Sequence, residues 1–194
     1  DGVDERTHWP LLGSAALSGI QTRAIIRAGL QAPRNMLFDS TSLGDLTLDN
    51  RVGLAPMTRV SATADGRATD RMAQYYAKFA EGGFSFLVTE GTYTDNVYSK
   101  GYRKQPGLVT DDHVEAWTQV TDAAHDAGGA IFAQLMHSGA QNQGIPQDAD
   151  QETIAPSAVQ PDGEKNEAYG GDGPYPRPKK ATKEDLETAR EGFV

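Results

Sequence analysis

The residues best suited to chemistry gather in three short polar runs, each directly after an apolar run of strand length. The runs are Ala55–Arg59, Thr89–Thr92 and Gln134–Gly139. They contain hydroxyl, amide, carboxyl and guanidinium groups, which are uncommon in a packed core, together with glycine and proline. Polar groups at the ends of buried strands are typical of a binding site. The three runs therefore predict a site for a small molecule.

Several other kinds of chemistry are excluded by the residue types. The chain has no cysteine, so it has no disulfide, no thiolate zinc site and no cysteine nucleophile. No two of the four histidines have ligand spacing, and we expect no metal site. His137 either contacts a ligand or bonds within its own loop. His125 is expected at a helix C-terminus, where the dipole favours it, and His8 and His113 are expected to be exposed bystanders.

Apolar periodicity and paired glycines define the elements that must position these runs. The sequence predicts half of a hairpin at Leu46 and Leu48, strands over 52–56, 84–89 and 130–136, and helices starting near Thr69, Thr110 and Thr182. Gly82-Gly83 and Gly128-Gly129 end the first two helices. Strands that are apolar on both faces indicate a parallel sheet covered on each side. The alternation of strand and helix predicts an α/β fold.

Each predicted helix carries one apolar face. The faces comprise Met72, Tyr75, Tyr76, Phe79 and Ala80 on the first helix, Val114, Trp117, Val120 and Ala124 on the second, and Leu186, Ala189 and Phe193 on the third. Thr110 and Thr182 are expected N-caps, each followed by acidic residues in the first turn.

The loops after the strands distinguish between the two common α/β folds, the barrel and the doubly wound sheet. They run for about ten residues after Thr58, almost 20 after Gly91 and over 40 from His137 to Thr182, lengths that are usually functional. A doubly wound nucleotide-binding fold would place G-x-G-x-x-G between the first strand and helix, and no such run is present. The sequence favours a barrel.

Charge and hydropathy exclude further classes. Lys and Arg number 18 against 27 Asp and Glu, a net charge of -9, so a general nucleic-acid binder is excluded. No apolar run approaches the roughly 20 residues that span a bilayer, and we expect a cytoplasmic location. Residues 1–35 carry four arginines and few acids. We expect them to be an N-terminal extension outside the barrel, with Met36 as the native start; a targeting peptide is the alternative.

The motifs, taken in order, resemble the N-terminal half of the old yellow enzyme family, which comprises FMN-dependent ene-reductases and NADH:flavin oxidoreductases. They are Asn50–Arg59, Tyr75-Tyr76, Thr89–Thr92, Gly101-Tyr102 with Pro106-Gly107, Ala116-Trp117, His125–Gly129, Gln134–Gly139, Ala155–Ser157 and the helix at Thr182. The resemblance implies a TIM (β/α)8 barrel, here truncated to the N-terminal hairpin and about the first three βα units over residues 36–194. It also implies a non-covalent FMN, reduced by NADH or NADPH, that passes hydride to an activated alkene such as an enone or nitroalkene.

The same resemblance implies a set of cofactor-binding residues: Ala55, Pro56, Met57, Thr58, Gly91 and Gln134, with His137 as a possible ligand contact. Thr58 is expected near flavin O4 and N5, and Gln134 at the pyrimidine edge. Within an apolar strand, an unpaired Gln134 amide would cost about 1–3 kcal/mol, so it needs a partner. The alternatives are a local backbone bond for Thr58, an ordinary strand-end role for Gly91 and a core hydrogen bond for Gln134.

Other family features are expected outside these residues. The substrate-binding His-x-x-Asn or His-x-x-His pair and the proton-donating Tyr are expected beyond Val194, so no catalytic residue is assigned, and the phosphate-binding loops follow strands seven and eight. Ala140 stands where family members often carry Arg. Glu90 is expected in a structural ion pair, or as a base, and Arg59 in a structural contact or at the flavin. We expect this segment alone to be poorly stable, weak in FMN binding and inactive.

Three alternatives remain at the level of the sequence. One is a 2,4-dienoyl-CoA-reductase-like flavoenzyme. Another is a non-flavin TIM-barrel lyase or isomerase, for which Glu90 is the only strand-end candidate. The third is a non-catalytic half-barrel that associates with a partner. Homo-oligomerisation is compatible with each of these alternatives.

Overall fold

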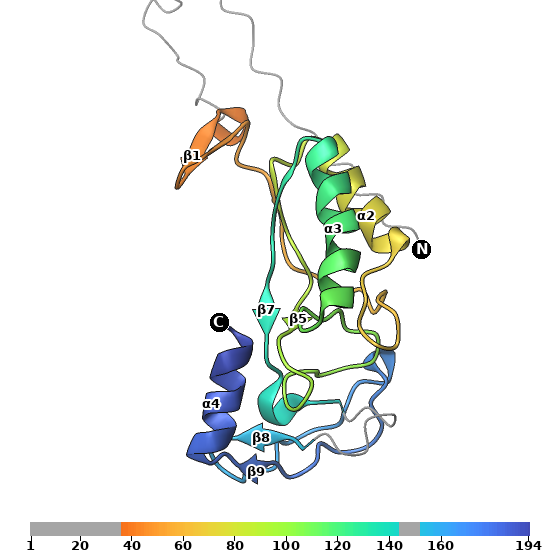
Figure 1. Ribbon diagram of the computed structural model, residues 1–194, viewed down its shortest axis with the longest axis vertical. Helices are drawn as coiled ribbons and strands as arrows, with labels where there is room; N and C mark the ends of the chain where they lie inside the picture. The colour runs from red at the N-terminus through yellow and green to blue at the C-terminus, as the bar shows by residue number, and fades with distance from the viewer. Residues whose placement is uncertain (1–35, 144–151) are drawn as a thin grey trace, which may run out of the picture. The chain divides into compact units, whose positions relative to one another are not determined.

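The computed structural model describes residues 36–143 and 152–194 (Figure 1). The predicted extension over 1–35, with His8, lies outside the described residues, so its role stays a prediction. The described part begins with a 3-10 turn, η1 (Met36–Phe38), and a hairpin. In the hairpin, β1 (Thr41–Leu43) pairs antiparallel with β2 (Leu46–Leu48). Gly44 makes the turn at a φ of 59°, which suits glycine. The predicted hairpin is confirmed.

A three-stranded parallel sheet follows, in the order β3-β4-β6. The strands are β3 (Gly53–Leu54), β4 (Phe86–Val88) and β6 (Ala130–Phe132). Leu87 of β4 pairs with Leu54 on one side and Ile131 on the other. Because all three strands run the same way, their carboxyl ends lie at one edge. The α/β class predicted from the sequence is confirmed.

Two helices connect these strands in the expected βα order. They are α2 (Asp70–Glu81), between β3 and β4, and α3 (Asp111–Asp126), between β4 and β6. The two helices pack side by side (Figure 1). The Thr110 hydroxyl caps α3 by accepting from the His113 backbone N–H. Thr69 starts α2 without a side-chain cap, and its hydroxyl instead donates to the Ser61 carbonyl.

The core lies between the sheet and these helices. Its buried members are Leu54, Ala62, Met72, Tyr76, Ala80, Leu87, Trp117, Val120 and Ala124. Gly129 lets the start of β6 approach α2, because a Cβ there would lie 2.7 Å from the Ala80 Cβ. One predicted core residue is wrong: Val114 is 53% exposed. The inward position in that turn of α3 belongs to His113, which is buried.

The strand predicted over 130–136 is divided in two. β6 ends at Phe132, and β7 (Leu135–Met136) pairs instead with β5 (Thr92–Tyr93) in a second parallel pair. Ala133 and Gln134 lie at the break and are exposed. Gln134 is therefore not inside an apolar strand, and the predicted burial of its amide is wrong.

The segment from His137 to Thr182 was expected to be a long loop without regular structure, but its described residues contain several short elements. These are η2 (Gly139–Gln141), β8 (Ile154–Ala155), η3 (Glu167–Tyr169) and β9 (Lys179–Lys180). β8 and β9 pair in parallel. The last helix, α4 (Lys183–Gly192), has a full capping box in which Thr182 and Asp185 exchange hydrogen bonds. The predicted cap at Thr182 is confirmed.

Tyr98 joins the loop after β5 to the start of α4. Its hydroxyl donates to Asp185 Oδ1 over 2.6 Å, and Lys179 Nζ lies 3.1 Å from the same oxygen. Hydrogen bonds from the Thr182 backbone and the Tyr98 hydroxyl hold the pKa of Asp185 well below its usual range. Asp185 is thus an acceptor shared by three segments of the chain.

Within residues 36–143 and 152–194, no helix combines the length and the apolar character needed to cross a bilayer.

Truncation of Leu87, which is fully buried at the centre of the sheet, tests the core. Leu87→Ala should lower the free energy of unfolding by about 2–5 kcal/mol, because it leaves a cavity beside both neighbouring strands. The control is Val114→Ala on the exposed face of α3, which should change it by less than about 0.5 kcal/mol. Urea unfolding followed by circular dichroism measures both, and equal losses would contradict this placement of the core.

Candidate functional site

The three polar runs lie next to one another at the carboxyl edge of the β3-β4-β6 sheet. The Gln134 backbone N–H donates to Thr89 Oγ1 over 3.0 Å, and the Thr92 N–H donates to the Gln134 carbonyl over 2.8 Å. The Arg59 backbone N–H donates to Glu90 Oε2 over 2.9 Å. These bonds join the first run to the second and the second to the third. The prediction that the runs form one site is supported by this contact chain.

Residues 55–58 form an exposed segment directly after β3. Ala55, Pro56, Met57 and Thr58 all lie on the surface, and Met57 is 46% exposed. The chain then turns at Val60, which has a φ of 53°. An exposed apolar stretch beside a hydroxyl can support one face and one edge of a planar ring.

Tyr102 connects Thr58 to Gly91. Burial raises the pKa of Tyr102, and an interaction with the Thr58 side chain partly opposes the rise. The Tyr102 hydroxyl donates to the Gly91 carbonyl over 3.2 Å, and Gln105 Nε2 donates to the same oxygen over 3.0 Å. Tyr102 and Gln105 thus form a buried polar support for the edge. Tyr102 lies in a sequence motif, Gly101-Tyr102, whereas Gln105 lies in none. The sequence did not predict the supporting role of Tyr102.

Gly91 is needed for packing between strands. A Cβ there would lie 2.3 Å from Met136 Sδ and 3.2 Å from Met136 Cβ, so a larger residue would require the Met136 side chain to move. This contact favours the structural alternative for Gly91 over direct approach to a ring. Its backbone still sets the position of Thr92 and, through it, of Gln134.

The Gln134 side chain is exposed beside this edge. Its backbone is held on both sides, whereas its amide has no hydrogen-bond partner among the described residues. The side chain therefore offers one donor and one acceptor to a ligand from a fixed backbone.

Glu90 is fully buried behind the edge. Its Oε2 accepts from the Arg59 N–H, and its own N–H donates to the Tyr76 hydroxyl over 2.9 Å. Its Oε1 has no partner among the described residues. Burial raises the pKa of the Glu90 carboxyl. The expected ion pair is not formed in the part of the chain that the structure describes, and backbone hydrogen bonding replaces it.

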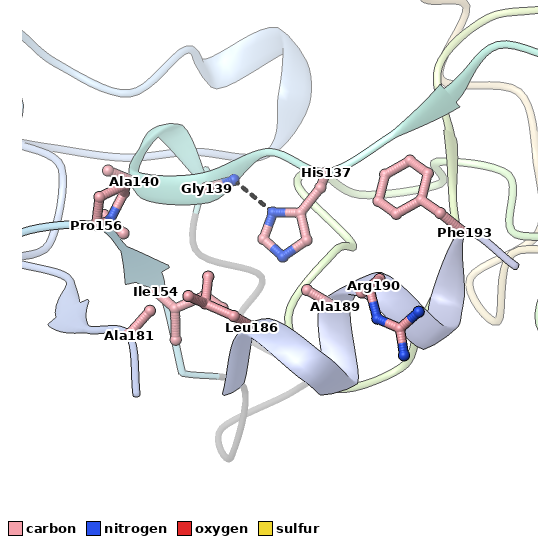
Figure 2. A pocket seen from close by; sticks show the side chains of 11 residues that line it. His137, Gly139, Ala140, Ile154, Pro156, Ala181, Leu186, Ala189, Arg190 and Phe193 are labelled. Atoms are coloured by element: carbon pink, nitrogen blue, oxygen red, sulfur yellow. Dashed lines mark hydrogen bonds between the residues drawn. The ribbon is translucent and has the colours of Figure 1, made fainter. Parts of the chain in front are cut away.

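His137 forms the loop hydrogen bond that was one of its two alternatives, and the ligand contact stays a prediction. Its Nδ1 accepts from the Gly139 N–H over 3.0 Å, so the neutral ring carries its proton on Nε2. Nε2 is buried without a partner in the described residues, and burial lowers the pKa of the ring. Figure 2 shows the ring beside α4, in a pocket of about 490 Å³ lined by Ile154, Leu186 and Phe193.

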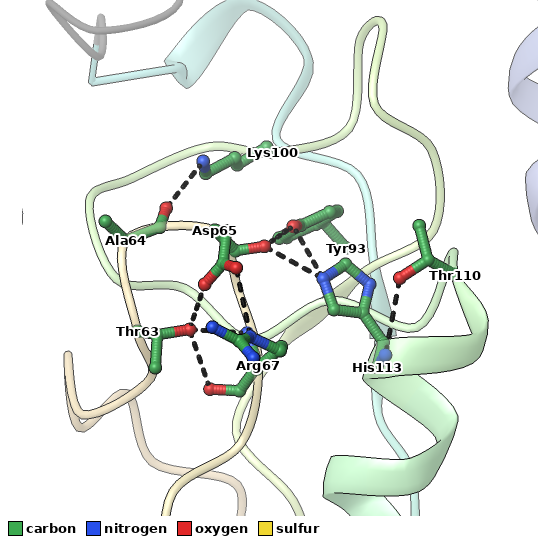
Figure 3. Close-up of polar contacts among 8 residues, drawn as sticks. All are labelled: Thr63, Ala64, Asp65, Arg67, Tyr93, Lys100, Thr110 and His113. Atoms are coloured by element: carbon green, nitrogen blue, oxygen red, sulfur yellow. Dashed lines mark hydrogen bonds and ion pairs between the residues drawn. The ribbon is translucent and has the colours of Figure 1, made fainter.

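His113 is not the exposed bystander that was expected, because only 3% of it is exposed. Its Nδ1 accepts from the Val109 N–H, and its Nε2 lies 2.8 Å from the Asp65 carbonyl oxygen. The Tyr93 hydroxyl donates to that oxygen over 3.0 Å (Figure 3). His113 therefore fixes the loop between β3 and α2 against β5. Apolar periodicity could not reveal this, since histidine buried through hydrogen bonds breaks the pattern.

The other predicted histidine role is confirmed: His125 lies in the last turn of α3 and is exposed. Among the residues that the structure describes, no three His, Asp or Glu side chains gather as metal ligands would.

The chain is similar to proteins of one family in both sequence and structure. The family model for the NADH:flavin oxidoreductase / NADH oxidase family matches residues 36–194. A probable flavin mononucleotide-dependent alkene reductase of Leishmania infantum is 33% identical over 150 residues, which are 74% of this chain and 40% of that protein.

Two solved structures are similar over a larger share of the chain. The old yellow enzyme homologue from Zymomonas mobilis has a TM-score of 0.71 and 34% identity over 81% of this chain and 42% of its own. Morphinone reductase in complex with tetrahydroNAD has a TM-score of 0.71 and 30% identity over 81% and 44%. The chain thus spans about two fifths of the length of these proteins.

Glu90→Gln tests the buried carboxyl. A carboxyl whose pKa is raised by folding keeps its proton in the native state after the unfolded chain has released it. The native state of the wild type should therefore lose stability as the pH rises from about 4.5, the ordinary pKa of glutamate, through the raised pKa. The variant has no such ionisation, so its stability relative to wild type should increase with pH over that window.

Urea unfolding at a series of pH values measures this difference, and the exposed Glu81→Gln on α2 is the control. A difference between Glu90→Gln and wild type that does not vary with pH would contradict the burial of a titrating group.

Proposed function

The chain belongs to the NADH:flavin oxidoreductase / NADH oxidase family, and from this premise we propose that it supplies the flavin-binding edge of an FMN-dependent reductase. The fold prediction is confirmed on the same ground, since the chain superposes on old yellow enzymes, which are TIM barrels. The hairpin and the three βα units are therefore part of a TIM barrel.

The observation that carries the proposal is the junction of the three polar runs at the carboxyl edge of the sheet. In TIM-barrel enzymes the chemistry takes place at this end of the strands. Thr58 and Gln134 come from the first and third strands, and hydrogen bonds through Thr89, Thr92 and Tyr102 hold the segments between them. Two hydrogen-bonding side chains are thus fixed by separate strands on one surface.

The residues present fit an isoalloxazine ring. Ala55, Pro56 and Met57 provide an exposed apolar support, the Thr58 hydroxyl can donate or accept, and the Gln134 amide can do both at once. A pyrimidine edge alternates acceptors and donors, which matches an amide side chain. When bound, FMN would take hydride from NADH or NADPH and deliver it to the alkene. The part of this chain is to bind the ring, orient its edge and keep Gln134 and Thr58 in place.

The substrate we propose is an alkene activated by a carbonyl, nitro or similar group. The similarity to a probable alkene reductase supports this class. His137 offers an Nε2–H in an apolar pocket, and such a donor suits one acceptor atom on a largely apolar ligand. We assign His137 a binding role, and none of the described residues is assigned as the catalytic acid.

Substitution of the two edge side chains tests the proposal. Gln134→Leu should weaken FMN binding about tenfold, because it removes a donor and an acceptor together, and Thr58→Val should weaken it by a smaller factor. Both side chains are exposed, and thermal unfolding of each variant checks that the fold is kept, since Thr58→Val also removes the interaction with Tyr102. Quenching of FMN fluorescence on titration with the chain measures the affinity.

The matched controls lie on the exposed face of α3. Gln119→Leu and Thr118→Val make the same chemical changes away from the edge and should bind FMN as wild type does. If Gln134→Leu and Thr58→Val also bind as wild type does, these residues do not hold the flavin.

A further inference from the structure

Three cationic side chains, Arg59, Arg71 and Lys78, line a second pocket beside α2. Arg71 and Lys78 lie seven residues apart on α2, two turns along one face, and Arg59 comes from the segment after β3. The pocket has a volume of about 250 Å³, and Ser61, Gln74 and Tyr75 also line it. Arg59 belongs to one of the polar runs at the proposed flavin edge, and the other residues of this pocket do not.

The three cations have no carboxylate partner among the described residues, although the chain as a whole carries a net charge of -9. The Arg59 guanidinium carbon lies 4.3 Å from the centroid of the Tyr75 ring, which holds it over the ring. The buried carboxyl of Glu90 accepts a hydrogen bond from the Arg59 backbone, and its interaction with the Arg59 guanidinium is electrostatic, without an ion-pair contact. Asp70 and Glu81, the acids of α2, form no ion pair with Arg71 or Lys78.

The Tyr75 ring lines the pocket and holds the Arg59 guanidinium beside it. The Tyr75 hydroxyl is buried and has no hydrogen-bond partner among the described residues. With the two guanidinium groups, the ammonium group and the Gln74 amide, the pocket presents mainly donors.

We propose that this pocket binds a phosphate group, either as free phosphate or as the phosphate monoester of a nucleotide. Planar guanidinium groups form paired, charge-assisted hydrogen bonds with phosphate oxygens, and lysine adds a point charge. Pockets for drug-sized ligands are about 300–1,000 Å³, so this smaller cavity suits a single phosphate group. Phosphate binding at this pocket requires no flavin, so a test of it is independent of a test of the proposed function.

The test is a titration of the flavin-free chain with inorganic phosphate at constant ionic strength, followed by the shift in its thermal unfolding. Arg71→Gln/Lys78→Gln removes two charges from the pocket and should weaken phosphate binding at least about tenfold. Arg51→Gln/Lys180→Gln removes two exposed charges elsewhere and should bind phosphate as wild type does.

The absence of a saturable shift with wild type would overturn the proposal. So would an equal shift with potassium chloride, or a double variant that binds as tightly as wild type. Competition then identifies the source of the group. NADPH competing with phosphate far better than NADH indicates the 2′-phosphate of a nucleotide, and equal weak competition by both indicates free phosphate.

Discussion

The parallel pairing of β4 with β3 and β6 is the constraint on which the rest of the molecule depends. Leu87 is buried between Leu54 and Ile131, and this register aligns the ends of three strands that are far apart in the sequence. A shift of one residue would turn Leu87 to the opposite face and misplace the polar runs. The same strand register therefore buries Leu87 and aligns the polar runs at the edge of the sheet.

A layer of buried polar groups then converts strand alignment into fixed side-chain positions. Thr89 and Glu90 act through side chains that bond backbone of the neighbouring runs, and Tyr102 and Gln105 converge on the Gly91 carbonyl. Buried hydrogen bonds of this kind hold their members in place, because each member would pay a desolvation penalty if it moved away from its partner.

Local sequence signals predicted the helices and strands. Contacts between residues far apart in the sequence determine the features that these signals could not predict. The cap at Thr110 and the glycine pair after α2 depend on neighbours within a few residues, so the sequence was sufficient for them. The burial of His113 depends on the Asp65 carbonyl, 48 residues away. Similarly, the break at Gln134 arises because β7 pairs with β5 instead of continuing β6. The members of the site were recognisable by type, whereas their exposure required the tertiary structure.

Arg59 occupies the boundary between the two sites, and its geometry keeps them distinct. Its backbone N–H is held by Glu90 at the flavin edge, whereas its guanidinium lies over Tyr75 beside α2. The turn at Val60 follows at once. With the Arg59 guanidinium over Tyr75, Thr58 is the hydrogen-bonding side chain that this run would offer in the proposed flavin site. The same orientation concentrates positive charge where a phosphate group can use it.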